Sequence, residues 1–300
     1  MSEAQLKYVN CLGPAGLHRM AYWEWGCTAP LPPGQAAPVV VCVHGLTRQG
    51  RDFDELARVL SSQYRVICPD VAGRGESDWL ASPAAYQIPT YVADMVTLLA
   101  RLDVDWVDWV GTSMGGLIGM GLAALRGGSA TPMVRRLVLN DVGPQIEFAS
   151  LQRIGAYLGQ NMAFDSLEQG RDYLLSISKG FGPHSAEQWA ALSAPMFKHD
   201  PASDQWRLHY DPQIAQAFKL VTPELAQASS AALWQVYDAL SCPTLLLRGA
   251  ESDLLTSQTA QAMAQRGPCA QVQELSGVGH APTLVQPDQI ERVRAFLGAV

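Results

Sequence analysis

The chain has 300 residues, of which 48% are hydrophobic and 16% are charged, a composition typical of a globular protein with a sizeable core. Its formal net charge of −7 argues against binding to nucleic-acid phosphates, which requires clustered Lys and Arg. No run approaches the ~18 apolar residues of a membrane span, and the N-terminal stretch lacks the apolar core of a secretory signal. We therefore expect a soluble, cytoplasmic protein without nucleic-acid or membrane partners.

The cysteines show no sign of a metal site or a disulfide framework. Six are present, they lie far apart, and none belongs to a C-x-x-C pair. Cys42 and Cys68 fall inside predicted strands, where cysteine serves as a small apolar residue. We expect reduced, mostly buried thiols and no zinc site.

The first half of the chain predicts a hairpin followed by alternating strands and helices. Two stretches flank a Gly-Pro-Ala-Gly turn and predict antiparallel strands at 6–12 and 18–25. A run of valines at 39–43 is typical of a central parallel strand. Further strands are predicted at 65–68, 107–110 and 136–140, and helices at 52–60, 89–102 and 116–125.

The alternation stops at Gln145 and returns only after residue 233. Between them lie helical patterns punctuated by prolines, and beyond them strands are predicted at 244–247 and 272–275 and a helix from about 288. A stretch of ~90 residues is too long for a structureless loop. We interpret residues 145–233 as a helical cap, inserted over the ligand crevice of an α/β core that is formed by residues 1–144 and 234–300.

A serine stands at a sharp turn between a predicted strand and a predicted helix. Residues 107–116 read VDWVGTSMGG, with Ser113 between Gly111 and Gly115. In a G-x-S-x-G turn, backbone strain exposes the serine hydroxyl, and the glycines avoid collisions with the neighbouring strand and helix. The motif alone is weak, because small residues share turns by chance. Its position makes Ser113 our candidate nucleophile, with a tight turn and a surface serine as the alternative.

The serine needs a base to take its proton and an acid to orient that base. In α/β sheets of this kind the order along the chain is Ser, acid, His. His280 is the histidine that follows a late strand, in LSGVGHAP, and we predict it as the base.

For the acid we predict Asp253, which follows the strand at 244–247 in the sequence RGAESDL. Asp141 also follows a strand directly and could serve in a variant arrangement. Glu251 lies on the same loop as Asp253, two residues earlier, and Asp238 precedes its strand, which places it at the wrong edge of the sheet.

Acyl transfer also needs N–H donors for the developing oxyanion. We predict the backbone N–H groups of Met114, next to the nucleophile, and of Leu46, in the loop after the strand at 39–43. In the same loop, the His44 side chain is expected to hold the loop by hydrogen bonds and to transfer no proton. Arg48 is expected to be a solvated surface residue, with recognition of a substrate carboxylate as the alternative.

In this order, these motifs resemble the α/β-hydrolase superfamily. The likeness runs from about Val39 through nearly the whole chain, and the cap is its least specific part. The motifs that carry the resemblance are His44-Gly45, the PD…GRGES stretch at 69–77, the serine turn with Gly116, Gly249 with Asp253, and Gly279-His280. The chain looks like the cap-bearing branch of small-molecule esterases, enol-lactonases and C–C bond hydrolases. The resemblance implies an eight-stranded, mostly parallel sheet with an antiparallel second strand and a cap after the sixth strand. It implies neither a cofactor nor a metal.

The serine at the turn favours acyl-enzyme chemistry, because dehalogenases and epoxide hydrolases of this fold have an aspartate there. We expect a carboxylic ester hydrolase that cleaves a small-molecule ester or lactone with a Ser113–His280–Asp253 triad. The first alternative is a C–C bond hydrolase of dienoic ring-cleavage products, although those usually carry Asn where Thr112 stands. The second is a ligand-binding receptor built on the same fold.

The large apolar side chains of the cap are expected mostly to pack the cap itself. If several of them face Ser113, the substrate is apolar and of small to medium size. They are Phe148, Tyr157, Met162, Phe164, Trp189, Phe197, Trp206 and Phe218.

Overall fold

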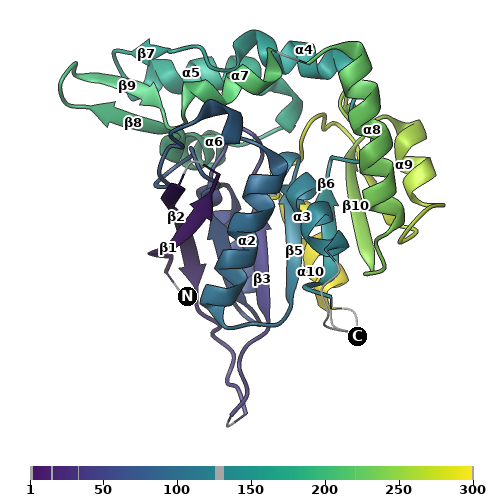
Figure 1. Ribbon diagram of the computed structural model, residues 1–300. Coiled ribbons are helices and arrows are strands. Elements are labelled where there is room, and N and C mark those ends of the chain that lie inside the picture. The colour runs from purple at the N-terminus through teal and green to yellow at the C-terminus, as the bar shows by residue number, and fades with distance from the viewer. Residues whose placement is uncertain (1–2, 15, 33, 126–131, 220, 299–300) are drawn as a thin grey trace.

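The computed structural model describes residues 3–14, 16–32, 34–125, 132–219 and 221–298. Within them, helices cover both faces of a central eight-stranded sheet, and an inserted segment lies across one end of it, at the top of Figure 1. The strands of this sheet are β1 (Gln5–Gly13), β2 (Gly16–Trp25), β3 (Val39–Val43), β4 (Arg65–Pro69), β5 (Val107–Thr112), β6 (Val134–Asn140), β10 (Thr244–Gly249) and β11 (Gln271–Leu275).

The strand order is β1-β2-β4-β3-β5-β6-β10-β11. β2 is antiparallel to β1 and β4, and every later pair in this order is parallel. This confirms the mostly parallel sheet with an antiparallel second strand. The carboxyl ends of β3, β5, β6 and β10 therefore meet at one edge, where open α/β sheets bind their ligands.

Two apolar layers hold the helices to the sheet. Met95, Ile118 and Tyr237, from three helices on one face, are fully buried against the strands, and Leu56 and Val293 are fully buried on the other face. The helices of the first face are α2 (Ile88–Leu102), α3 (Met114–Ala124), α8 (Pro223–Asp238) and α9 (Ser257–Met263), and those of the second are α1 (Asp54–Leu60) and α10 (Pro287–Gly298). The helices packed on both faces therefore hold the strands, and the edge that they form, in fixed positions.

The segment between β6 and β10 contains a small sheet as well as helices. We expected helices alone, but β7, β9 and β8 form a three-stranded antiparallel sheet. Strands of two to four residues are too short to give a recognisable period-two pattern. The elements are α4 (Phe148–Tyr157), β7 (Ala163–Phe164), α5 (Leu167–Ile177), η3 (Lys179–Phe181), α6 (Ala186–Ser193), η4 (Ala194–Met196), β8 (Phe197–Asp200), β9 (Gln205–Leu208), η5 (Pro212–Ile214) and α7 (Ala215–Phe218).

The core elements agree with the prediction apart from their ends. The helix expected at 52–60 is a short η1 (Gly50–Phe53) followed by α1, and another 3-10 turn, η2 (Pro83–Ala85), precedes α2. α9 was not predicted, because its sequence SQTAQAM has little apolar periodicity. The expected cap boundary at residue 233 falls inside α8, which packs on α3. Among the described residues, no helix has the length and apolar character needed to cross a membrane.

Candidate active site

Ser113 stands at the sharp turn between β5 and α3. Its φ of 52° lies in the left-handed region, which costs a residue other than glycine of order 1–3 kcal/mol. The flanking glycines allow this turn. A Cβ on Gly115 would lie 2.0 Å from the Val43 carbonyl oxygen, and one on Gly111 would lie 2.3 Å from the Gly115 carbonyl oxygen. The close approach of β3, β5 and α3 therefore requires both glycines, and it leaves Ser113 at the start of α3.

Ser113 is hydrogen-bonded to His280, which lies in the loop after β11. The Ser113 Oγ is 3.0 Å from His280 Nε2, and His280 Nδ1 is 2.7 Å from Oδ2 of Asp141. A neutral imidazole with its proton on Nδ1 donates to Asp141 and accepts the serine hydroxyl hydrogen at Nε2. The arrangement joins the ends of β5, β6 and β11 in one continuous chain of hydrogen bonds.

The carboxylate of Asp141 is fully buried at the end of β6. Besides His280, the Gly249 N–H donates to its Oδ1 at 2.9 Å and the Ser252 hydroxyl donates to its Oδ2 at 2.6 Å. Its backbone N–H donates to the Leu247 carbonyl at 2.8 Å. Three donors compensate for the loss of water around the carboxylate and fix its orientation toward His280.

Asp253, which we predicted as the partner of His280, lies elsewhere. Half of its side chain is exposed, and it pairs with Arg153 of α4, with Nε–Oδ2 and Nη2–Oδ1 distances of 2.7 and 2.9 Å. β10 ends at Gly249, and the loop beyond it carries Asp253 out to the cap, whereas Asp141 follows β6 directly. The prediction of Asp253 is therefore wrong, and the alternative, Asp141, holds the position.

Two donors to Asp141, Gly249 N–H and the Ser252 hydroxyl, were not predicted. The sequence signal for them is weak, because both precede the more conspicuous Asp253 in RGAESDL. The signal for Asp141 itself is that an acid comes immediately after an apolar strand, with no intervening residue to carry it away from the sheet edge.

His44 holds the loop after β3, as expected. It is fully buried, its Nδ1 lies 2.7 Å from the Gly45 carbonyl oxygen, and its Nε2 accepts the Val71 N–H at 2.9 Å. Burial lowers the pKa of His44 to about 3, so the ring is neutral and its Nδ1–H donates. Because C=O and N–H of a trans peptide point in opposite directions, fixing the Gly45 carbonyl also fixes the Leu46 N–H. The buried Arg74 holds the next peptide through a 2.8 Å bond to the Leu46 carbonyl oxygen.

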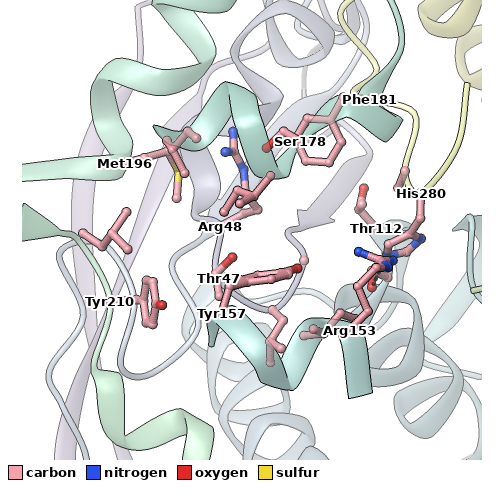
Figure 2. A pocket seen from close by; sticks show the side chains of 18 of the residues that line it. Thr47, Arg48, Thr112, Arg153, Tyr157, Ser178, Phe181, Met196, Tyr210 and His280 are labelled. Carbon is pink, nitrogen blue, oxygen red and sulfur yellow. Dashed lines mark hydrogen bonds between the residues drawn. The ribbon is translucent and has the colours of Figure 1, made fainter. Parts of the chain in front are cut away.

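Ser113 and His280 line a cavity between this loop and the cap. Its volume is about 110 Å³, well below the roughly 300–1,000 Å³ of sites that hold drug-sized ligands. In Figure 2, Thr112, Arg153 and His280 stand on one side and Met196 and Tyr210 on the other. Most of the remaining wall is apolar or aromatic. The cavity therefore suits a small, mainly apolar group next to Ser113.

Most of the eight large apolar residues predicted for the cap do not line this cavity. Tyr157 is the one that does. Phe164 and Phe197 pack edge to face with ring centroids 5.7 Å apart in a separate cluster inside the cap. The expectation that most of them pack the cap is thus confirmed. Besides Tyr157, the aromatic residues that line the cavity are Tyr173, Phe181 and Tyr210.

Arg48 was expected at the solvated surface, and that expectation is wrong. Only 8% of the residue is exposed. Its Nε and Nη2 donate to the Asp52 carboxylate at 2.7 and 2.6 Å, and Nη2 also donates to the Leu192 carbonyl of α6. Arg48 therefore ties the loop after β3 to the cap, and Asp52 occupies the place of a ligand carboxylate.

The cap is also tied to the loop that carries His280. The Gly279 N–H donates to the Gly180 carbonyl in η3 at 2.7 Å. His184 Nε2 lies 2.8 Å from the Thr283 hydroxyl. Hydrogen bonds on both sides of His280 thus hold the cap over the cavity.

Among the described residues, one buried group combines metal-ligand types: Cys11, His18 and Asp94. His18 Nε2 is 3.0 Å from Asp94 Oδ2. Burial and the nearby Asp94 raise the pKa of the Cys11 thiol to about 12, so the thiol is protonated at neutral pH. None of the three lines the cavity. We interpret the group as a buried His–Asp pair that joins β2 to α2.

Comparisons with known proteins agree with this geometry. The model of the alpha/beta hydrolase family matches residues 40–293. A 3-hydroxybutyrate-oligomer hydrolase of Cupriavidus necator is 53% identical over 291 residues, which cover 96% of each chain. A pimeloyl-[acyl-carrier protein] methyl ester esterase of Xanthomonas campestris pv. campestris is 25% identical over 271 residues, which cover 88% of this chain and 96% of the relative.

A crystal structure of an alpha/beta hydrolase from Novosphingobium aromaticivorans superimposes over the full length of both chains, with a TM-score of 0.84 and 33% identity. The matched family model leaves out β1 and β2 but covers nearly all of the other six strands of the main sheet, the serine turn and the cap, and the Cupriavidus relative extends the match to nearly the whole chain. The chain therefore belongs to the α/β-hydrolase family and is an enzyme, a carboxylic ester hydrolase.

Proposed function

We propose that this enzyme hydrolyses the ester bonds of short 3-hydroxybutyrate oligomers, with Ser113 as nucleophile, His280 as base and Asp141 as the acid that orients it. The observation that carries the chemistry is the hydrogen-bonded chain Ser113–His280–Asp141, with its serine and histidine facing a cavity. The substrate class comes from the relative that is 53% identical over 96% of both chains.

In the first step, Ser113 Oγ attacks the ester carbonyl carbon and His280 Nε2 takes its proton. Asp141 stabilises the resulting imidazolium through Nδ1. The negative charge that develops on the carbonyl oxygen is bound by the N–H groups of Leu46 and Met114. The bond to the alcohol oxygen then breaks, His280 returns the proton to that oxygen, and the acyl group remains on Ser113.

In the second step, water takes the place of the alcohol. His280 removes a proton from the water, whose oxygen attacks the acyl carbon of the ester on Ser113. The bond to Ser113 Oγ breaks, the serine regains its proton from His280, and the hydroxy acid leaves. The loop contacts of His44 and Arg74 keep the Leu46 N–H in place for both steps.

The size and lining of the cavity favour this substrate class. Each 3-hydroxybutyrate unit is short and carries one methyl group, and the volume beside Ser113 is about 110 Å³ with a mainly apolar wall. A cavity of this size accommodates one or two such units rather than a long polymer chain.

The test compares wild-type protein with Ser113→Ala on the dimer, trimer and tetramer of 3-hydroxybutyrate. p-Nitrophenyl acetate, butyrate and octanoate serve as general ester substrates. We expect the wild type to release 3-hydroxybutyrate, and Ser113→Ala to lose activity on all esters by about 10⁴-fold or more. Circular dichroism and the thermal midpoint of the variant should match the wild type.

Two results would contradict the proposal in different ways. Hydrolysis of the p-nitrophenyl esters without release of 3-hydroxybutyrate would reject the substrate class and leave the Ser113 mechanism. Absence of serine-dependent ester hydrolysis in a folded protein would reject the mechanism. Dienoic ring-cleavage products, the substrates of C–C hydrolases, are the comparison set for that second result.

A further inference from the structure

Arg153, on the cap helix α4, lines the cavity that holds Ser113 and His280. Asp253 contacts one edge of its guanidinium through Nε and Nη2. A guanidinium has five N–H donors in a plane, and Asp253 uses two of them, one on each of two nitrogens. Tyr157 also shares a hydrogen bond with Arg153, and the remaining donors are available to an acceptor in the cavity.

The positive charge of Arg153 acts on a side chain that lines the cavity. Burial raises the pKa of the Tyr157 hydroxyl, and the Arg153 charge acts in the opposite direction through Coulomb attraction and a hydrogen bond. Tyr157 itself lines the cavity. Among the described lining residues there are two arginines and no Asp or Glu, so a negatively charged ligand group meets no acidic side chain on the wall.

The two arginines differ in how strongly their charges are already compensated. Arg48 is buried with Asp52 at 2.6 Å and also donates to a carbonyl of the cap. Arg153 and Asp253 are 45% and 50% exposed, and ion pairs exposed to this degree are weak because water screens them. A second carboxylate therefore binds more readily to Arg153 than to Arg48.

We infer that Arg153 is a specificity-determining residue that binds the free carboxylate at the end of a short hydroxy-acid oligomer. The inference rests on the proposed function. Each such oligomer has one free carboxylate, and in the dimer it belongs to the leaving hydroxy acid, only a few bonds from the carbonyl that Ser113 attacks. Asp253 acts as a positioning residue, because it holds one edge of the guanidinium so that the other edge faces the cavity.

The experiment measures kcat and KM for the 3-hydroxybutyrate dimer and for its primary amide, which lacks the negative charge and keeps a single ester bond. For Arg153→Gln we expect the ratio of the two KM values, acid over amide, to rise about tenfold or more, as for loss of a charged hydrogen bond. Arg153→Lys, which keeps the charge, should recover part of that ratio. Arg266→Gln is the matched control, because Arg266 pairs with Asp238 at similar exposure and neither residue lines the cavity, and it should behave as wild type.

A second readout does not depend on cleavage of oligomers. Free 3-hydroxybutyrate should inhibit p-nitrophenyl acetate hydrolysis competitively in the wild type and at least about tenfold less strongly in Arg153→Gln, whereas 3-hydroxybutyramide, which is neutral and has no ester bond, should inhibit the two proteins equally. An equal loss for charged and neutral ligands in Arg153→Gln would overturn the inference. Failure of the wild type to cleave any oligomer, with the inhibition pattern intact, would reject the proposed substrate and leave carboxylate binding by Arg153 standing.

Discussion

The cavity has a core wall and a cap wall, and their side chains are held in place in different ways. On the core wall, Ser113 is fixed in a strained turn between packed elements, and Asp141 and His44, which lie behind this wall, are fully buried. On the cap wall, Arg153 is half exposed, and its helix α4 buries two of its ten residues, against seven of eleven in α3. The difference teaches that the reacting atoms are held by the rigid sheet edge, whereas the residue that we infer to select the substrate stands on a more exposed helix of the cap.

The sharpest comparison of the two walls is between their aspartates. We expect Asp141→Asn to lower kcat by about 10⁴-fold, because an amide at this position orients the wrong imidazole tautomer. Asp253→Asn should lower kcat by less than about tenfold, because it removes only a partner of Arg153. Steady-state kinetics on p-nitrophenyl butyrate measure both, and equal losses would mean that the carboxylate contacts seen at His280 do not govern the reaction.

Glycine-to-alanine substitutions test whether the core wall and the cap wall differ in how much they tolerate an added methyl group. In Gly115→Ala the new methyl would lie 2.0 Å from the Val43 carbonyl oxygen, and we expect a loss of about 3 kcal/mol or more in the free energy of unfolding. Gly155 in α4 has nothing within 4 Å of the same position, so Gly155→Ala should gain up to about 1 kcal/mol from helix propensity. Urea unfolding gives both values, and the comparison fails if the two changes have the same sign.

Substitution of the cap wall should alter selectivity rather than general activity. Phe181 lines the cavity from η3, and Phe181→Ala enlarges it. We expect the ratio of kcat/KM for p-nitrophenyl octanoate over butyrate to rise about tenfold, whereas Asp141→Asn should lower both rates by the same factor. An unchanged ratio in Phe181→Ala would show that the acyl chain does not reach this side chain.

The smallest expected effect concerns two His–Asp pairs. The hydrogen bond to Asp94 raises the pKa of the buried His18 above its usual 6.5, so the folded state holds this proton more tightly than the unfolded chain. The stabilisation is present below pH 6.5 and is lost as pH rises through the folded-state pKa. We expect the His18 contribution, measured as the unfolding free energy of the wild type minus that of His18→Gln, to fall by about 1 kcal/mol or less between pH 6 and pH 9.

His18→Gln should be less stable overall and lose this pH-dependent part. His199 pairs with Asp204 on the exposed surface of the cap, so His199→Gln should follow the wild-type pH curve in urea unfolding. A difference between the wild type and His18→Gln that stays constant or grows from pH 6 to pH 9 would contradict the assignment.

The same contrast explains which features could be predicted from the sequence. The sheet, Ser113 and His280 were predictable, because their positions depend on apolar strand patterns and on local turn chemistry that involves few residues. The choice between Asp141 and Asp253 depends on how far each acid lies beyond its strand: Asp141 follows β6 directly, whereas the path of the longer loop to Asp253 is not specified by a local pattern. Arg48 and the small cap sheet depend on contacts between segments far apart in the chain, such as the bond from Arg48 to Leu192.

The hydrogen bond from Gly279 to Gly180 gives a way to time the opening of the cavity without any substrate. The amide of Gly279 precedes His280 and is covered by the cap carbonyl at 2.7 Å, so its hydrogen exchanges with deuterated solvent only when the two segments separate. At a pH where chemical exchange is faster than reclosing, the exchange rate at this one amide equals the rate at which the cap leaves the catalytic histidine. A turnover number higher than that opening rate would mean that esters reach Ser113 while this contact stays closed.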